Sequence, residues 1–163
     1  MAIVIEPYIP QTITVHLGPP DAPAENVTVS FPDYVKNVAS SEIYPTWEPA
    51  AIRANVLAII SFALNRVYTE FYPSRGYDFQ ITSSTAYDQK FIRGRNFFDS
   101  ISTVVDDVFD SYLRREGVLE PLAANVGSIK LLPRKIRESS LNPFVNSMLV
   151  KQIHVTGRKG DET

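Results

Sequence analysis

The segment that decides the fold is PAAIRANVLAIISFALNRVYTEF, residues 49–71. Its apolar residues recur at helical spacing and cover most of the helix surface: Ile52, Val56, Leu57, Ile59, Ile60, Phe62, Ala63, Leu64 and Val67. Pro49 suits the first helical position, and Pro73 and Gly76 follow where the helix must stop. A helix that is apolar on so many sides is normally central to a fold. We therefore expect Pro49 to about Phe71 to be the most buried element.

Short strands are predicted on both sides of this helix, because apolar residues alternate with a period of two. The alternating sets are Ile3 and Ile5, then Ile13, Val15 and Leu17, then Val27, Val29 and Phe31, and later Tyr77, Phe79 and Ile81. Pro32 is expected to end the third of these strands, and Asp33 to cap a short helix from Tyr34 to about Ile43. The polar run 82–85 is typical of a loop.

A second clear helix is predicted from Asn96 to Arg115, with Gly117 as the residue that ends it. Its inward-facing residues are expected to be Phe97, Ile101, Val104, Val105, Val108, Tyr112 and Leu113. Residues 118–123 are a candidate strand. The predicted fold class is α+β, a single domain in which two main helices pack on short, mostly antiparallel strands.

Composition limits the function classes. The chain has 163 residues, of which 44% are hydrophobic and 21% charged, as in one ordinary globular domain. With no cysteine, it has no disulfide framework, no cysteine-ligated zinc and no cysteine nucleophile. A net charge of -2 gives no bulk electrostatic case for binding nucleic acid. The longest strongly apolar run, Val56–Leu64, is shorter than the roughly 20 residues of a membrane span.

The charge balance changes near residue 124. Residues 1–124 hold 9 Lys and Arg against 15 Asp and Glu, whereas residues 125–163 hold 7 against 3. The later segment also lacks a clear apolar period. We therefore divide the chain into residues 1–124 and a divergent basic tail, residues 125–163, which we expect to add little to stability. The N-terminus lacks the basic and long apolar regions of a signal peptide, so a cytoplasmic location is not excluded.

The sequence contains no nucleotide-binding glycine motif, no metalloprotease HExxH and no GxSxG. His16 and His154 are its two histidines, and we expect both to be structural or surface residues rather than metal ligands. No metal or cofactor is predicted. Glu42 is a candidate acid, because Tyr44 and Trp47 follow it closely and a carboxyl beside aromatic surface has a raised pKa. The alternative is a helix-end glutamate bonded to a loop amide.

Two stretches carry a resemblance to a known family. FPDYVKNVASSE, residues 31–42, and WEPAAIRAN, residues 47–55, resemble the SpoIID/LytB domain, which includes the stage II sporulation protein D and the LytB amidase enhancers. The resemblance covers roughly residues 27–124, and its most specific part is the register of Glu42, Trp47 and the helix that follows. Asn55 and Ile60 stand where the family usually has Gln and Arg, and no GLSQWG-like motif follows residue 124. The chain therefore looks like a truncated or frame-altered member.

The resemblance implies a peptidoglycan-acting protein of the bacterial cell wall or spore envelope. It implies lytic transglycosylase cleavage of glycan strands, with Glu42 as the single acid/base. The alternatives are a non-catalytic glycan-binding module, one that enhances a partner cell-wall amidase, and an inactive fragment. Candidate substrate-binding residues are aromatic or polar: Tyr44, Trp47, Ser83, Ser84, Tyr87, Asp88 and Gln89. Each has an ordinary alternative in loop packing or local hydrogen bonding. Arg93 and Arg95 flank Gly94 and would meet peptide-stem carboxylates or form a solvated turn.

Overall fold

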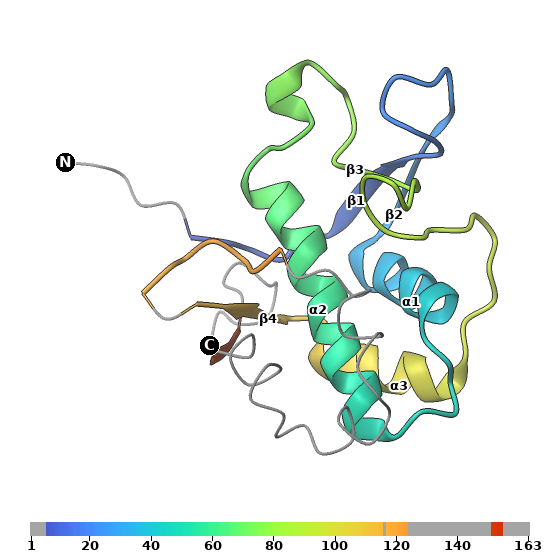
Figure 1. Cartoon of the computed structure of the whole chain (residues 1–163), viewed down its shortest axis with the longest axis vertical. Helices are drawn as coiled ribbons and strands as arrows, with labels where there is room; N and C mark the ends of the chain where they lie inside the picture. The colour runs from blue at the N-terminus through green and yellow to red at the C-terminus, as the bar shows by residue number, and fades with distance from the viewer. Residues whose placement is uncertain (1–5, 116, 124–150, 155–163) are drawn as a thin grey trace.

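Helix α2 (Pro49–Tyr68) crosses the middle of the molecule, and the other described elements pack around it (Figure 1). The computed structural model describes residues 6–115, 117–123 and 151–154. Twelve of the 20 residues of α2 are buried, and Ile59 and Ile60 have no exposed surface. The predicted central helix is thus confirmed. It ends three residues earlier than expected, since the chain turns at Glu70, whose φ of 49° is left-handed.

Helices α1 (Phe31–Glu42) and α3 (Asp99–Val108) pack on one side of α2, and strand β4 (Ser111–Arg114) packs on the other (Figure 1). Two surface ion pairs join α3 to its neighbours: Lys36 Nζ lies 2.8 Å from Asp106, and Arg53 Nη1 lies 2.6 Å from Asp107. The side chains shared by these elements form one continuous core.

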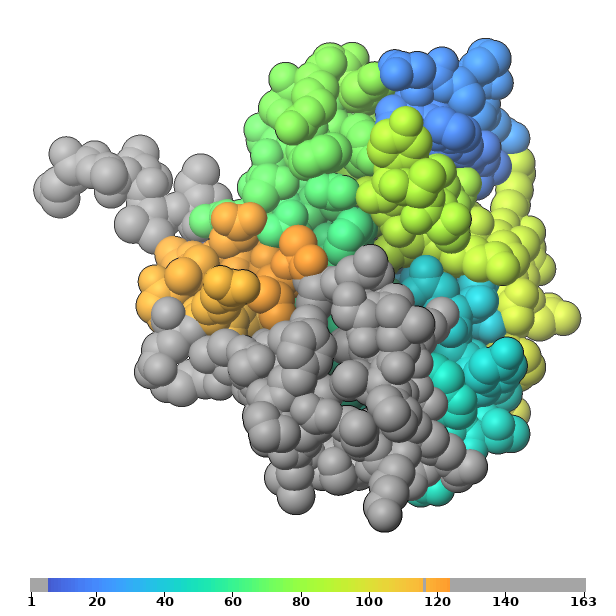
Figure 2. All heavy atoms as spheres, viewed as in Figure 1, coloured from blue at the N-terminus to red at the C-terminus, as the bar shows by residue number. Residues whose placement is uncertain are grey.

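A three-stranded sheet also packs against both α1 and α2. Strand β1 (Thr12–His16) is central, pairing antiparallel with β2 (Asn26–Ser30) and parallel with β3 (Ile81–Thr82). The register sets Val15 opposite both Val27 and Ile81, so that the apolar face of β1 enters the core. Figure 2 shows the segment around β3 lying against the β1–β2 hairpin on the face viewed. The fold is a single α+β domain with mostly antiparallel strands, as the sequence predicts.

Helix α1 corrects the predicted start of the first helix. It begins at Phe31, which the alternation pattern assigned to a strand, and its N-cap is Ser30 rather than Asp33. The Ser30 hydroxyl accepts a hydrogen bond from the Asp33 backbone N–H at 3.2 Å. Pro32 does not end a strand here. It lies in the first turn of α1, where a proline is tolerated. Phe31 is then free to turn its fully buried ring into the core.

Helix α3 is shorter than predicted. It covers 10 residues, and Tyr112 and Leu113, predicted to lie on its inner face, belong to β4. Both are buried in either case, so the apolar pattern could not distinguish the two structures. A tertiary contact decides it: the Leu113 N–H donates to Ser61 Oγ on α2 at 2.7 Å. Gly117 does have the predicted left-handed φ, 77°, but in the turn after a strand.

Other strand boundaries also differ from prediction. Phe79 is buried but lies outside β3, and Thr82, assigned to a loop, belongs to it. Within 118–123 the structure has an isolated bridge, between Arg114 and Pro121, in place of a strand. The strand predicted at Ile3 and Ile5 lies outside the described residues, as does most of the basic tail. One tail segment, β5 (Lys151–His154), pairs antiparallel with β4.

The hydropathy of α2 bears on membrane association. By length and composition alone, the stretch Pro49–Arg75 would be able to cross a membrane, but 67% of its most apolar window is buried inside the fold. The buried core helix of a soluble protein can have the same length and hydropathy, so these properties are weak evidence for a membrane span. The expectation of no membrane span stays a prediction.

The burial of α2 gives a direct test. Ile59→Asp places a charge where no water reaches, so we expect it to lower the free energy of unfolding by roughly 4 kcal/mol or more. Thermal and urea unfolding followed by circular dichroism measure this loss. Ile92→Asp is the matched control, because Ile92 is 38% exposed and the same change there leaves the charge in water. An unchanged melting temperature for Ile59→Asp would contradict the central position of α2.

Candidate functional site

The link between the two core helices positions Glu42. This residue is the last of α1, and the chain leaves the helix at Ile43, whose backbone is extended and whose side chain is buried. A tight turn follows, closed by the Trp47 N–H on the Tyr44 carbonyl at 3.2 Å, and α2 starts at Pro49. A core helix thus holds each end of the link, so a rigid scaffold positions the residues between.

A groove of about 680 Å³ lies beside this link. Its lining residues come from α1, the link and the segment before α3: Ser40, Ser41, Glu42, Ile43, Tyr44, Pro45, Trp47, Arg95 and Phe98. The rings of Tyr44 and Trp47 lie 5.8 Å apart at 55°, and Tyr44 is 68% exposed. Glu42, Tyr44 and Trp47, which the sequence selects as acid and stacking residues, are thus brought together at one opening.

The second wall of the groove is fastened to α1 by hydrogen bonds. The side chain of Asn37 holds Ile92 by both backbone groups, donating to its carbonyl at 2.7 Å and accepting from its N–H at 2.9 Å. Ser40 Oγ accepts from the Phe98 N–H at 3.3 Å. Glu42 itself is half-buried, and its Oε1 accepts from the Lys90 N–H at 2.9 Å. The groove is therefore a preformed feature of the fold.

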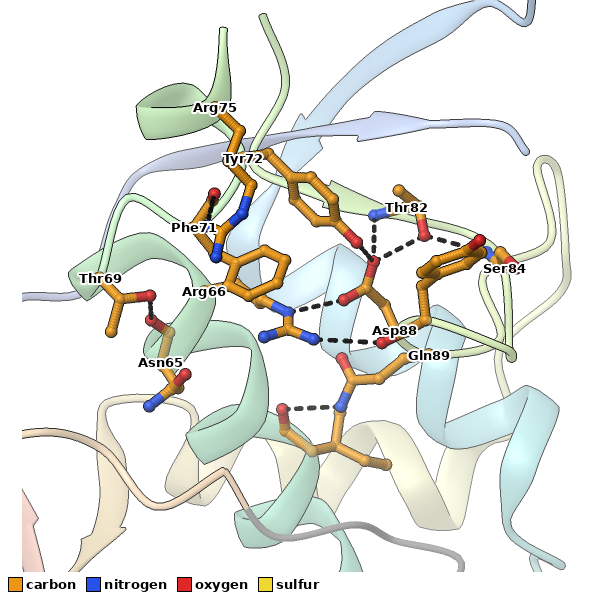
Figure 3. A network of polar contacts seen from close by, with 12 residues as sticks. Asn65, Arg66, Thr69, Phe71, Tyr72, Arg75, Thr82, Ser84, Asp88 and Gln89 are labelled. Atoms are coloured by element: carbon orange, nitrogen blue, oxygen red, sulfur yellow. Dashed lines mark hydrogen bonds and ion pairs between the residues drawn. The ribbon is translucent and has the colours of Figure 1, made fainter. Parts of the chain in front are cut away.

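Asp88, a predicted sugar-binding residue, is engaged inside the fold (Figure 3). Its side chain has no exposed surface, and Oδ1 pairs with Arg66 Nε at 2.7 Å. Its Oδ2 accepts from the Tyr72 hydroxyl at 2.6 Å, and from the backbone N–H and hydroxyl of Thr82 at 3.0 and 2.6 Å. Arg66 also donates to the Tyr87 carbonyl at 3.1 Å. This carboxylate joins α2, β3 and the loop after β3.

Gln89 is buried and bridges two helices. Its Oε1 accepts from the Tyr34 hydroxyl at 2.9 Å, and its Nε2 donates to the Ile59 carbonyl at 3.1 Å. Burial, and then the Asp88 and Glu42 charges, raise the pKa of Tyr34 well above its usual value. Burial and the hydrogen bond to Asp88 likewise raise the pKa of Tyr72. Both phenols therefore stay protonated and donate these bonds at neutral pH.

The remaining predicted residues lie on the loop that carries Asp88. The Ser83 N–H donates to the His16 carbonyl, and the Ser84 N–H to Thr82 Oγ1. Tyr87 is 54% exposed. None of the five residues predicted between 83 and 89 lines the groove, so three of the eight predicted site residues come together there.

Sequence reasoning did not select Phe98 and gave Arg95 two alternatives. Phe98 adds an aromatic side chain to the groove lining. The apolar pattern predicts Phe97 on the inner face of a helix and does not select Phe98, but in the structure both side chains are more than a third exposed. Arg93 pairs with Glu25 at 2.6 Å, whereas Arg95 enters the groove lining.

No metal site is evident within residues 6–115 and 117–123, where no three His, Cys, Asp or Glu side chains gather. His16 is buried, with Nδ1 2.7 Å from Asn26 Oδ1 and Nε2 2.9 Å from the Ala22 carbonyl. It stacks on Phe79 with ring centroids 4.5 Å apart. This packing fits the expected structural role. The His154 side chain lies outside the described part.

Comparison with known proteins gives no assignment. No protein-family model matches this chain, and no curated protein matches it. The resemblance to the SpoIID/LytB domain stays a prediction, based on residues 31–55 of this sequence.

The polar network gives a test that separates folding from binding. Asp88→Asn removes the charge that Arg66 meets inside the fold, so we expect the free energy of unfolding to fall by roughly 2–4 kcal/mol. Asp78→Asn is the matched control, because Asp78 is exposed, and we expect it to change stability by less than about 0.5 kcal/mol. Urea unfolding measures both. Unchanged stability in Asp88→Asn, together with lost glycan binding, would instead place Asp88 in a binding site.

Proposed function

We propose that this protein binds peptidoglycan glycan strands in the Glu42 groove and cleaves them as a lytic transglycosylase. One observation carries the proposal: the carboxylate and the two aromatic residues that the sequence selects line the same opening. The exposed ring of Tyr44 and the partly buried ring of Trp47 suit the apolar faces of sugar rings, and an open groove suits a polymer. Such a substrate would place the activity at the cell wall or spore envelope.

The proposed chemistry needs one carboxyl group. Glu42 gives its proton to the glycosidic oxygen, the C1–O bond breaks, and an oxocarbenium-like sugar remains. The Glu42 carboxylate then takes the proton of the C6 hydroxyl of the same sugar, whose oxygen bonds to C1 and closes an anhydro ring. Because this nucleophile is intramolecular, no second carboxylate is needed to activate water. Glu42 is the single carboxylate among the described residues that line the groove.

A second candidate function is a non-catalytic glycan-binding module that stimulates a cell-wall amidase. The hydrogen bond from the Lys90 N–H to Glu42 favours it, because this bond uses the carboxylate to attach the segment after β3 to the end of α1. The groove and its aromatic residues serve binding equally well in both functions.

Glu42→Gln distinguishes the two. The amide keeps the shape and still accepts from Lys90, but it cannot transfer the proton, so we expect cleavage to fall by roughly 10²–10⁴ while glycan binding persists. Mass spectrometry of digested peptidoglycan for anhydro-sugar ends measures cleavage, and co-sedimentation with sacculi measures binding.

Glu70→Gln is the matched control, since Glu70 is exposed beyond the far end of α2, roughly 30 Å from Pro49. If Glu42→Gln cleaves as fast as the parent chain, Glu42 is not the catalyst. Binding without cleavage in the parent favours the amidase-enhancing module. Absence of both leaves the inactive fragment.

A further inference from the structure

Arg95 lies where the groove meets a second hollow. The Arg95 N–H bonds to the Ile92 carbonyl at 3.1 Å and closes a turn through Gly94, whose φ of 77° is left-handed. The arginine lines the Glu42 groove and also an adjoining hollow of about 390 Å³ formed by residues 92–98. Its guanidinium carbon lies 5.8 Å from the centre of the Phe98 ring. The positive charge of Arg95 thus lies on the segment before α3, which the bond from the Phe98 N–H to Ser40 attaches to α1.

Arg95, like Lys90, Arg75 and Arg114, has no carboxylate partner among the described residues. Arg53, Arg66, Arg93 and Lys36 each form an ion pair within the fold. The Nε of Arg95 is shielded from water and meets no hydrogen-bond acceptor in the described part of the chain. A guanidinium that lines an opening and has no carboxylate partner inside the fold can pair with a carboxylate that a ligand supplies. The planar fork of a guanidinium fits a carboxylate with two parallel bonds.

We propose that Arg95 is the specificity residue of the groove and binds a carboxylate carried by the glycan. The inference rests on the proposed function, because it assumes that a glycan occupies the groove. Peptidoglycan differs from a neutral N-acetylglucosamine polymer in its muramic acid, which bears a lactyl carboxylate or the carboxylates of a stem peptide. Glu42 would repel such a group, so among the described lining residues Arg95 is the one whose charge stabilises it.

Fluorescence of Trp47 offers the readout, because Trp47 is the single tryptophan of the chain and lines the groove. Three tetrasaccharides of alternating N-acetylglucosamine and N-acetylmuramic acid are titrated: one with free lactyl carboxylates, one with these groups as neutral methyl amides, and one with stem peptides attached. The proteins are the parent, Arg95→Gln, Arg95→Lys and the matched control Arg75→Gln, which changes an exposed arginine beyond the far end of α2. Circular dichroism confirms that each variant is folded.

We expect the parent to bind a carboxylate-bearing sugar roughly 10- to 100-fold more tightly than the methyl amide. Arg95→Gln should lose this preference, Arg95→Lys should retain part of it, and Arg75→Gln should retain it in full. The sugar whose binding Arg95→Gln weakens, lactyl or peptidyl, identifies the source of the carboxylate.

Two results would overturn the inference while the proposed function stands: equal binding of all three sugars by the parent, or an equal loss for charged and neutral sugars in Arg95→Gln. The second would show that Arg95 shapes the groove or holds Glu42 in place. If the parent binds none of the three sugars and no sacculi, the proposed function itself fails.

Discussion

Burial of α2 on nearly all sides is the constraint on which the rest of the structure depends. A 20-residue helix with 12 buried positions cannot be covered by one partner, so helices pack on one side and β4 on another. Most of its few polar groups are satisfied inside the fold, although Asn55 Oδ1 meets no hydrogen-bond donor in the described part of the chain. Ser61 Oγ holds the backbone of β4, and the Ile59 carbonyl accepts from Gln89. The interior of α2 thus fixes the strand and the loop beside it.

The groove follows from the same constraint. Helices α1 and α2 are both anchored in the core, and the short link between them buries Ile43 and part of Trp47 while it exposes Tyr44. Asn37 and Ser40 bind the segment before α3 to α1, which builds the opposite wall. The exposed tyrosine at 44 and the cation at 95 therefore face one opening without being part of the core. Rigid support of this kind suits recognition of an extended ligand.

The loop after β3 shows how one polar cluster serves folding rather than the groove. Asp88 would be an expensive buried charge if it were alone, but Arg66, Tyr72 and Thr82 surround it with donors. Together with Gln89 it binds β3 and both long helices into one unit. Serines, carboxylates and amides clustered in a sequence fit a sugar site and a buried network equally well, because both need the same donors and acceptors.

The sequence by itself determined the central helix, the β1–β2 alternation, the α+β class and the grouping of Glu42 with Tyr44 and Trp47. These features depend on periodicity and on neighbours a few residues apart, which the chain order contains. Only the tertiary structure decided that residues 111–114 form a strand, that Gln89 and Asp88 turn inward, and that Arg95 and Glu42 line the same groove. Each of these depends on a partner about 20 to 60 residues away along the chain. No local pattern specifies which distant donor meets which acceptor, since packing around α2 makes that choice.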